Sequence, residues 1–203
     1  NVGKGNTLPM AELRAMLEKC GGTDVKTYVQ SGYAVFSTRK SKAAFTKAIE
    51  ADLHAYMGRP IATTLRDLPE MKAIVKANPL RNVASNPAYA CVTFLSNVPT
   101  KAEMAPLAAD DFGEEIFKLK GKEIYTWHPN GQGRSPLAVA LGKLRLRGAV
   151  TTRNWRTVLA ITEMLEAEAR RDQAQAGPLP AAPGQAGGGD HALAPAGRHD
   201  LQH

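Results

Sequence analysis

The sequence of 203 residues has no hydrophobic run approaching the ~20 consecutive apolar residues that a membrane-spanning helix needs. With 43% hydrophobic and 22% charged residues, its composition is typical of a soluble globular protein. No secretory signal peptide is recognisable, but the chain opens at Asn1 and not at a methionine. We therefore expect a cytoplasmic protein without a membrane association, whose natural start lies upstream of Asn1.

Cysteine is scarce, with Cys20 and Cys91 far apart and neither a CxxC spacing nor a histidine cluster beside them. This pattern predicts two reduced thiols that pack as small hydrophobic groups, and it predicts no disulfide. Three of the five histidines lie near the end of the chain, at a spacing that makes no metal site: His191, His199 and His203. We expect neither a metal nor another cofactor.

The common motifs of enzymes are also absent. The sequence contains no GxSxG, no Walker A lysine loop, no HExxH and no GxGxxG after a strand. A catalytic function would need a general base, and only His128, Tyr28 or a carboxylate brought in by the fold could serve. The sequence alone therefore favours binding over catalysis.

Cations are in excess, with a net charge of +7. No carboxylate occurs between Glu123 and Glu163, and residues 131–155 hold five cations. This excess favours an anionic partner. Two basic strips are either solvated edges or parts of a nucleic-acid surface: Arg39, Lys40, Lys42 and Lys47, and Lys143, Arg145 and Arg147. Four acids are expected to face solvent: Asp110, Asp111, Glu114 and Glu115.

Periodicity and capping signals divide the chain into two similar halves. The first half predicts a helix at 9–20, strands at 24–29 and 33–37, a helix from Ser41 to Gly58, a strand at 61–65 and a helix at 69–77. The second predicts a strand at 90–95, a helix capped by Thr100 and Glu103, strands at 116–119 and 123–127, a helix from Ser135, a strand near 149–151 and a helix at 154–170. The order of elements in the first half is the same as in the second half, except that the opening strand is missing from the first half.

This order predicts an α+β fold of two ferredoxin-like halves, each a split β-α-β unit, at residues 1–82 and 83–170. In such a unit the opening strand lies between two neighbours, so its loss would leave backbone groups unpaired. We therefore expect about six to ten apolar residues before Asn1, which is the length of an ordinary strand. Residues 171–203 are rich in alanine, glycine and proline and are expected to form a disordered tail.

Three segments are candidates for a binding site. Residues 128–135, HPNGQGRS, would direct amides at the Ser135 helix start toward an anion beside Arg134, or would form a turn that Ser135 caps. Residues 151–155, TTRNW, would offer Thr152, Arg153 and Asn154 to a carboxylate or phosphate, or would cap and anchor the last helix. Residues 28–32, YVQSG, supply donors at Gln30 and Ser31, although a hairpin turn alone explains the glycine.

Four segments together, NVGKGNTLPMAELR, TYVQSG, GRSPL and TTRNWRTVL, closely resemble the bacterial family of domain of unknown function 1697. Members of that family begin with a short hydrophobic strand that leads into a Gly-Ile-Asn-Val-Gly motif, so the resemblance implies that this chain starts inside the motif. It also implies an α+β fold of ferredoxin-like halves. The chain departs from the family pattern at Tyr33, where asparagine is usual, and at Pro136, where lysine is frequent. The family has no established activity.

The leading hypothesis is a cytoplasmic, non-catalytic binding module for an anionic or phosphate-bearing ligand, with nucleic acid as one form of it. Its polar lining is expected from eight residues: Asn1, Gln30, Ser31, Arg134, Ser135, Thr152, Arg153 and Asn154. Two alternatives stay open. One is an enzyme that acts on a nucleotide or phosphometabolite, and the other is a structural protein whose working surface is an interface with another chain.

Overall fold

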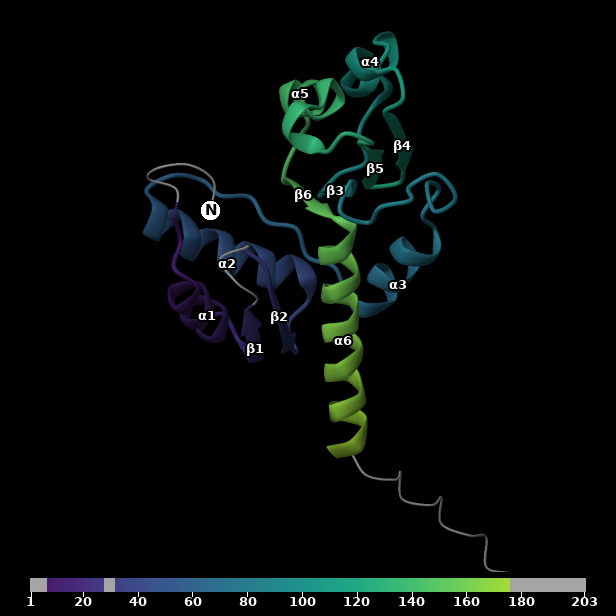
Figure 1. The fold of residues 1–203 in the computed structure, drawn as a ribbon. Helices are drawn as coiled ribbons and strands as arrows, with labels where there is room; N and C mark the ends of the chain where they lie inside the picture. Colours follow the sequence, from purple (N-terminus) through teal and green to yellow (C-terminus); the bar gives the residue numbers. More distant parts are fainter. Residues whose placement is uncertain (1–6, 28–31, 176–203) are drawn as a thin grey trace, which may run out of the picture.

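The computed structural model describes residues 7–27 and 32–175. Within these ranges the chain forms a mixed α+β structure with two antiparallel sheets, one of two strands and one of four. The two sheets belong to the two halves of the sequence (Figure 1). The α+β class expected from the sequence is therefore confirmed.

The first half carries the two-stranded sheet with two helices against it. Strands β1 and β2 pair antiparallel, with Gly22 opposite Thr38 and Thr27 opposite Ala34. The inner faces of the helices pack on this hairpin in a cluster that includes Leu13, Leu17, Phe45 and Ile49. The elements are α1 (Met10–Lys19), β1 (Gly22–Thr27), β2 (Ala34–Thr38), α2 (Lys42–Met57) and α3 (Leu68–Lys76).

The second half forms a four-stranded antiparallel sheet in the order β4-β5-β3-β6. The central strand β3 is buried along its whole length, because α4 and α5 cover one face of the sheet while α3 and α6 cover the other. The elements are β3 (Ala90–Leu95), α4 (Lys101–Ala109), β4 (Ile116–Lys120), β5 (Glu123–Trp127), a 3-10 turn (Gln132–Arg134), α5 (Pro136–Lys143), β6 (Val150–Asn154) and α6 (Trp155–Gln175).

Local side-chain caps set most of the helix starts. The Ser41 hydroxyl accepts from the Ala44 amide at 3.2 Å, and Thr100 with Glu103 forms a reciprocal capping box at the start of α4. At the other end of α2, Gly58 adopts a left-handed conformation with φ of 68°, which glycine accepts without steric cost. These three signals were readable in the sequence, and the structure confirms them.

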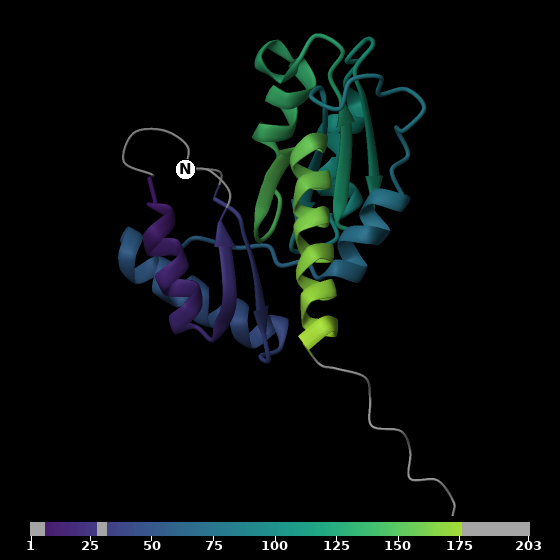
Figure 2. The same ribbon diagram turned by 60° about the horizontal axis from the view of Figure 1, so that its bottom comes forward.

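Helix α6 joins the two halves. It packs against β3 in the second half and against α3 and β2 in the first (Figure 2). An ion pair between Lys26 of β1 and Glu168 of α6 adds a polar link. Arg66 makes a second link, because its guanidinium donates to Glu123 Oε1 at 2.9 Å and to the Leu95 carbonyl at 2.7 Å.

Two expectations about the elements were wrong. Residues 61–65 form no strand, because no described strand lies beside them; the Thr63 amide donates instead to Glu50 Oε1 at 2.7 Å. Helix α6 continues to Gln175, five residues past the expected tail boundary at Arg170, and Arg171 pairs with Glu168 in this added turn. Residues 176–203 lie outside the described ranges. In the part of the chain that is described, no helix is both long and apolar enough to cross a membrane.

Candidate functional site

Arg153 of β6 lines a cavity of about 750 Å³, whose other walls come from the first half and from β3 and α6 of the second. Its Nη1 donates to the Thr151 hydroxyl at 2.7 Å and to the Thr152 carbonyl at 2.8 Å, which fixes the guanidinium against its own strand. Burial lowers the pKa of this guanidinium, while nearby Tyr33 acts in the opposite direction. Arg153 therefore presents a partly desolvated cation at the wall of the cavity.

The wall carries more positive than negative charge. Five cations line the cavity against one carboxylate, Asp67; these cations are Lys40, Lys42, Arg59, Arg66 and Arg153. Lys42 lies 2.6 Å from Asp67, and Arg66 is bound to Glu123. The volume falls within the range of about 300–1,000 Å³ that is usual for ligand pockets. The cavity thus has the volume of a ligand pocket and more cations than carboxylates in its wall.

The strand β6 separates the members of the TTRNW segment. Successive side chains of a strand point to opposite faces of its sheet. Thr151 and Arg153 accordingly face the cavity, whereas the Thr152 hydroxyl lies 2.7 Å from the Thr93 hydroxyl within the sheet. Asn154 caps α6, because its Oδ1 accepts from the Thr157 amide at 2.9 Å. The expected asparagine cap is confirmed, and of the three expected polar residues only Arg153 lines the cavity.

The start of α5 is already occupied by protein atoms. The Leu137 amide donates to Glu115 Oε2 at 2.9 Å, and the Ala138 amide donates to the Ser135 hydroxyl at 2.8 Å. An anion would have to displace Glu115 to reach the Leu137 amide and the Ser135 hydroxyl to reach the Ala138 amide. Arg134 lies in the adjoining 3-10 turn and is exposed. The serine therefore acts as a helix cap here, and the two residues do not line the cavity.

His128 is buried within the same network. Its Nδ1 lies 2.8 Å from Ser135 Oγ and 3.5 Å from Glu115 Oε1, and its Nε2 lies 2.8 Å from Thr126 Oγ1. Burial lowers the pKa of this imidazole, whereas Glu115 acts to raise it. With a fully buried side chain and both ring nitrogens engaged, His128 offers no open face to a substrate.

Glu115 corrects one expectation, because it is largely buried rather than solvent-facing. Its neighbours Asp110, Asp111 and Glu114 are exposed, as expected. Nothing in the local sequence distinguishes Glu115 from these three acids. Only the packing of the chain before β4 against the start of α5 gives it a different environment.

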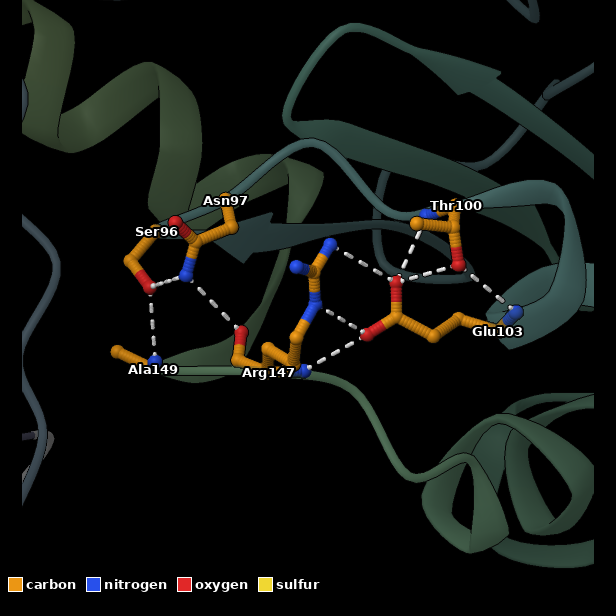
Figure 3. Close-up of polar contacts among 6 residues, drawn as sticks. All are labelled: Ser96, Asn97, Thr100, Glu103, Arg147 and Ala149. Atoms are coloured by element: carbon orange, nitrogen blue, oxygen red, sulfur yellow. Dashed lines mark hydrogen bonds and ion pairs between the residues drawn. The ribbon is translucent and has the colours of Figure 1, made fainter.

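The second basic strip is partly neutralised. Arg147 donates from Nε to Glu103 Oε1 at 3.0 Å, and Glu103 also completes the capping box with Thr100 (Figure 3). Hydrogen bonds from Thr100 and then from Arg147 lower the pKa of Glu103 to about 2. On the other side of this connection, the Ser96 hydroxyl accepts from the Ala149 amide at 2.9 Å. Arg147 thus helps to hold the 144–149 connection against the start of α4.

Several predicted groups cannot be placed with the others. Asn1, Tyr28, Gln30 and Ser31 lie outside the described residues.

Both cysteines are free and buried, as expected. Burial raises the pKa of the Cys91 thiol to about 12. Among residues 7–27 and 32–175, no group of three or more His, Cys, Asp or Glu side chains could hold a metal ion.

The fold and the cavity define an α+β protein of two halves with a cation-lined pocket. Residues 1–125 match the family model described as protein of unknown function (DUF1697), so the chain belongs to this family. The match ends before the GRSPL and TTRNW segments. The resemblance seen in the sequence is thus confirmed.

One solved structure has a similar fold. It is described as the conserved bacterial protein SP0830 from Streptococcus pneumoniae, with 22% sequence identity and a TM-score of 0.68. The similarity covers 82% of this chain and 93% of that chain. At this identity the likeness concerns the fold alone. No significant match is found among curated proteins.

Proposed function

We propose that this protein is a non-catalytic binding module for an anionic ligand, with Arg153 as the residue that pairs with the anionic group. The observation that carries the proposal is the position of Arg153 in the cavity wall, held by Thr151 and the Thr152 carbonyl. A cation that is partly removed from water gains more from an anionic partner than an exposed one does. Carboxylates and phosphates are the groups that suit a guanidinium.

Charge balance supports an anionic ligand over a neutral one. The side chains that line the cavity include five cations and one carboxylate, Asp67. A ligand with a negative group would reduce this excess. Asn1, Gln30 and Ser31 stay part of the proposal as further polar contacts. Ser135, Thr152 and Asn154 make hydrogen bonds within the fold, and Arg134 is exposed and does not line the cavity, so the proposal does not use these four.

Nucleic acid is the less favoured form of the anionic ligand. A nucleic-acid surface needs several cations directed at successive phosphates. Here Arg147 is paired with Glu103, and Lys42 is paired with both Asp67 and Glu70. Two members of the basic strips are thus already engaged. Binding of a short RNA at two salt concentrations tests this form, because phosphate contacts must weaken as salt rises.

The division of the α+β fold into two ferredoxin-like halves is also a proposal. We assign residues 1–82 and 83–170 to two tandem ferredoxin-like halves. The second half supports this with its β-α-β-β-α-β element order in one antiparallel sheet. The first half has the same order from its first helix to its second, through a hairpin that corresponds to β4 and β5.

A screen of small anions tests the functional proposal. Thermal-shift measurements with a panel of phosphorylated and carboxylated metabolites, each beside a neutral analogue, should give hits only among the charged members. Incubation of each hit with the protein should leave it unaltered. Turnover of a hit would instead favour an enzyme, and an absence of hits in the whole panel would contradict anion binding.

A further inference from the structure

Strand β4 forms the outer edge of the four-stranded sheet. It pairs with β5 on one side, and within residues 7–27 and 32–175 no strand lies on its other side. The opposite edge strand, β6, contributes Thr151 and Arg153 to the cavity wall, whereas no residue of β4 lines the cavity. Figure 1 shows β4 at the margin of the second half that lies away from the first half. The edge of β4 is therefore a surface separate from the proposed anion site.

The backbone of this edge has polar groups that β5 does not use. In an antiparallel pair, alternate residues exchange hydrogen bonds with the partner strand, and the residues between them direct their amide and carbonyl groups to the other side. On that side of β4 lies no strand of the described chain. Such an edge can take up an extended peptide as an additional strand, and the main-chain hydrogen bonds then contribute to the affinity.

The side chains of β4 alternate between two kinds of chemistry. Ile116 packs with the core under α3 and α6, and Phe117 packs with the core under α4 and α5. Because successive side chains of a strand point to opposite faces, Lys118 and Lys120 lie on the face of Ile116. Leu119 lies on the face of Phe117. The last three residues of the strand are exposed, and the exposed fraction of Leu119 is 39%. One face of the edge is therefore cationic and the other is apolar.

The cations of this edge are not neutralised by the described part of the chain. Within it, Lys118 and Lys120 form no ion pair with a carboxylate. Glu123 lies opposite Lys120 on β5, but its carboxylate is bound to Arg66. Lys120 donates to the Ala77 carbonyl at the end of α3, at 3.4 Å. A partner that carries carboxylates would therefore complement the charge of this edge.

A second copy of the chain fits this edge poorly. If two β4 strands paired antiparallel over all five residues, Lys118 would lie opposite Lys118. Like charges directly opposite each other destabilise a strand pair. An extended peptide with carboxylates at alternate positions would instead place them beside the two lysines, and the apolar residues between would cover Leu119. The pattern of the edge thus favours a peptide in which acidic and apolar residues alternate.

We propose that the outer edge of β4 is a docking site for an extended acidic peptide of another protein, which adds to the sheet as a further strand. The carboxylates of the peptide pair with Lys118 and Lys120, and its apolar side chains pack on Leu119. The inference goes beyond the proposed function, because it concerns another surface of the molecule and a polypeptide partner instead of the ligand of the cavity.

Three peptides with blocked ends, titrated into the whole chain and followed by NMR, test the proposal. The first is Thr-Glu-Val-Glu-Val-Glu-Thr, in which acidic and apolar residues alternate. The second has the same composition in blocks, Thr-Glu-Glu-Glu-Val-Val-Thr. The third is the first peptide with its backbone amides N-methylated, so that it cannot donate to a strand. The first should bind at least about tenfold more tightly than the other two. The amides that shift most should be those of residues 116–120.

A charge reversal in the protein tests the pairing with the lysines. Lys118→Glu should weaken binding of the first peptide about tenfold, because an opposite-charge pair across the two strands becomes a like-charge pair. The matched control is Lys47→Glu, the same charge change at an exposed position of α2, and it should alter the affinity by less than about twofold. Both substitutions are at exposed positions, and the NMR spectrum of each free variant shows whether it is folded.

Four results would overturn the proposal. They are no binding of the first peptide, equal affinities of the alternating and the block or N-methylated peptides, unchanged affinity in Lys118→Glu, and shifts in 116–120 that grow with the concentration of the protein alone. The last would mean that a second copy occupies the edge. Arg153→Gln should bind the peptide as the parent protein does, because Arg153 lies in the cavity wall. Failure of peptide docking and failure of the anion-binding proposal are thus distinguishable.

Discussion

His128 Nδ1 lies 2.8 Å from the Ser135 hydroxyl, and the same hydroxyl accepts a hydrogen bond from the Ala138 amide at the start of α5. The pair therefore ties the end of β5 to the cap of the next helix. Both side chains are buried. The glycine-containing turn between them is held by this contact, and Glu115 completes the network from the chain before β4.

Stability should fall in mildly acidic solution because of His128. Burial lowers the pKa of His128 in the folded protein, against the opposing effect of Glu115, while an unfolded histidine titrates near ~6.5. The unfolded chain then binds the proton more readily, so the free energy of unfolding decreases as the pH drops below ~6.5. This decrease in the free energy of unfolding ends at the pH where His128 is also protonated in the folded protein.

Urea unfolding between about pH 8 and pH 5 checks this expectation. His128→Gln should lack this component of the pH dependence, whereas His54→Gln, on an exposed position of α2, should retain it. An identical pH profile for the parent protein and both variants would show that His128 does not couple folding to protonation.

Removal of the Glu115 carboxylate should destabilise the protein. Glu115→Ala leaves the Leu137 amide without its acceptor and removes the carboxylate beside His128. The expected loss is about 1–3 kcal/mol in the free energy of unfolding. Glu114→Ala at the exposed neighbouring position should change it by less than about 0.5 kcal/mol. Equal effects of the two substitutions in urea unfolding would argue against a structural role of Glu115.

Gly148 should tolerate no side chain. It has a φ of +78°, and an added Cβ would collide with Ser96 Oγ and lie 2.6 Å from Asn97 Nδ2. The left-handed conformation alone costs an L-residue about 1–2 kcal/mol, and the contact with Ser96 adds to this. Gly148→Ala should therefore lower the melting temperature, whereas Gly133→Ala, with open space around it, should leave it nearly unchanged. A stable Gly148→Ala variant would contradict the geometry of the 144–149 connection.

Cys91 should be unreactive in the folded protein. Burial raises the pKa of its thiol to about 12, and the thiolate is the reactive form. In a Cys20→Ser variant, a maleimide should label Cys91 at least about 100-fold faster in denaturant than in native buffer. Rapid labelling without denaturant would mean that β3 opens readily or is not central.

The elements of the second half were predictable because their signals are local. The capping pair Thr100 and Glu103, the turn at Gly121 and the Ser135-Pro136 start each specify a boundary within a few residues. The strand predicted at 61–65 failed for the opposite reason. A strand forms only where a neighbouring strand pairs with it. The apolar, β-branched composition of residues 61–65 does not show whether such a neighbouring strand is present.

The candidate site was predictable only in part. The sequence singled out Arg153, which lines the cavity, but it could not show that the Thr152 side chain would point away from Arg153 into the sheet. The burial of Glu115 and the place of Arg59 in the cavity wall depend on contacts between distant segments. Such contacts leave no periodicity or spacing in the sequence.

The role of Arg153 in anion binding is tested most directly by an affinity comparison. The strongest charged hit of the metabolite panel is titrated into the parent protein, Arg153→Gln and the control Arg145→Gln, an equal charge change at an exposed position outside the cavity. We predict at least about tenfold weaker binding for Arg153→Gln, equivalent to about 1.4 kcal/mol, and a change below about twofold for Arg145→Gln. Equal affinities of the parent protein and Arg153→Gln would contradict the proposal.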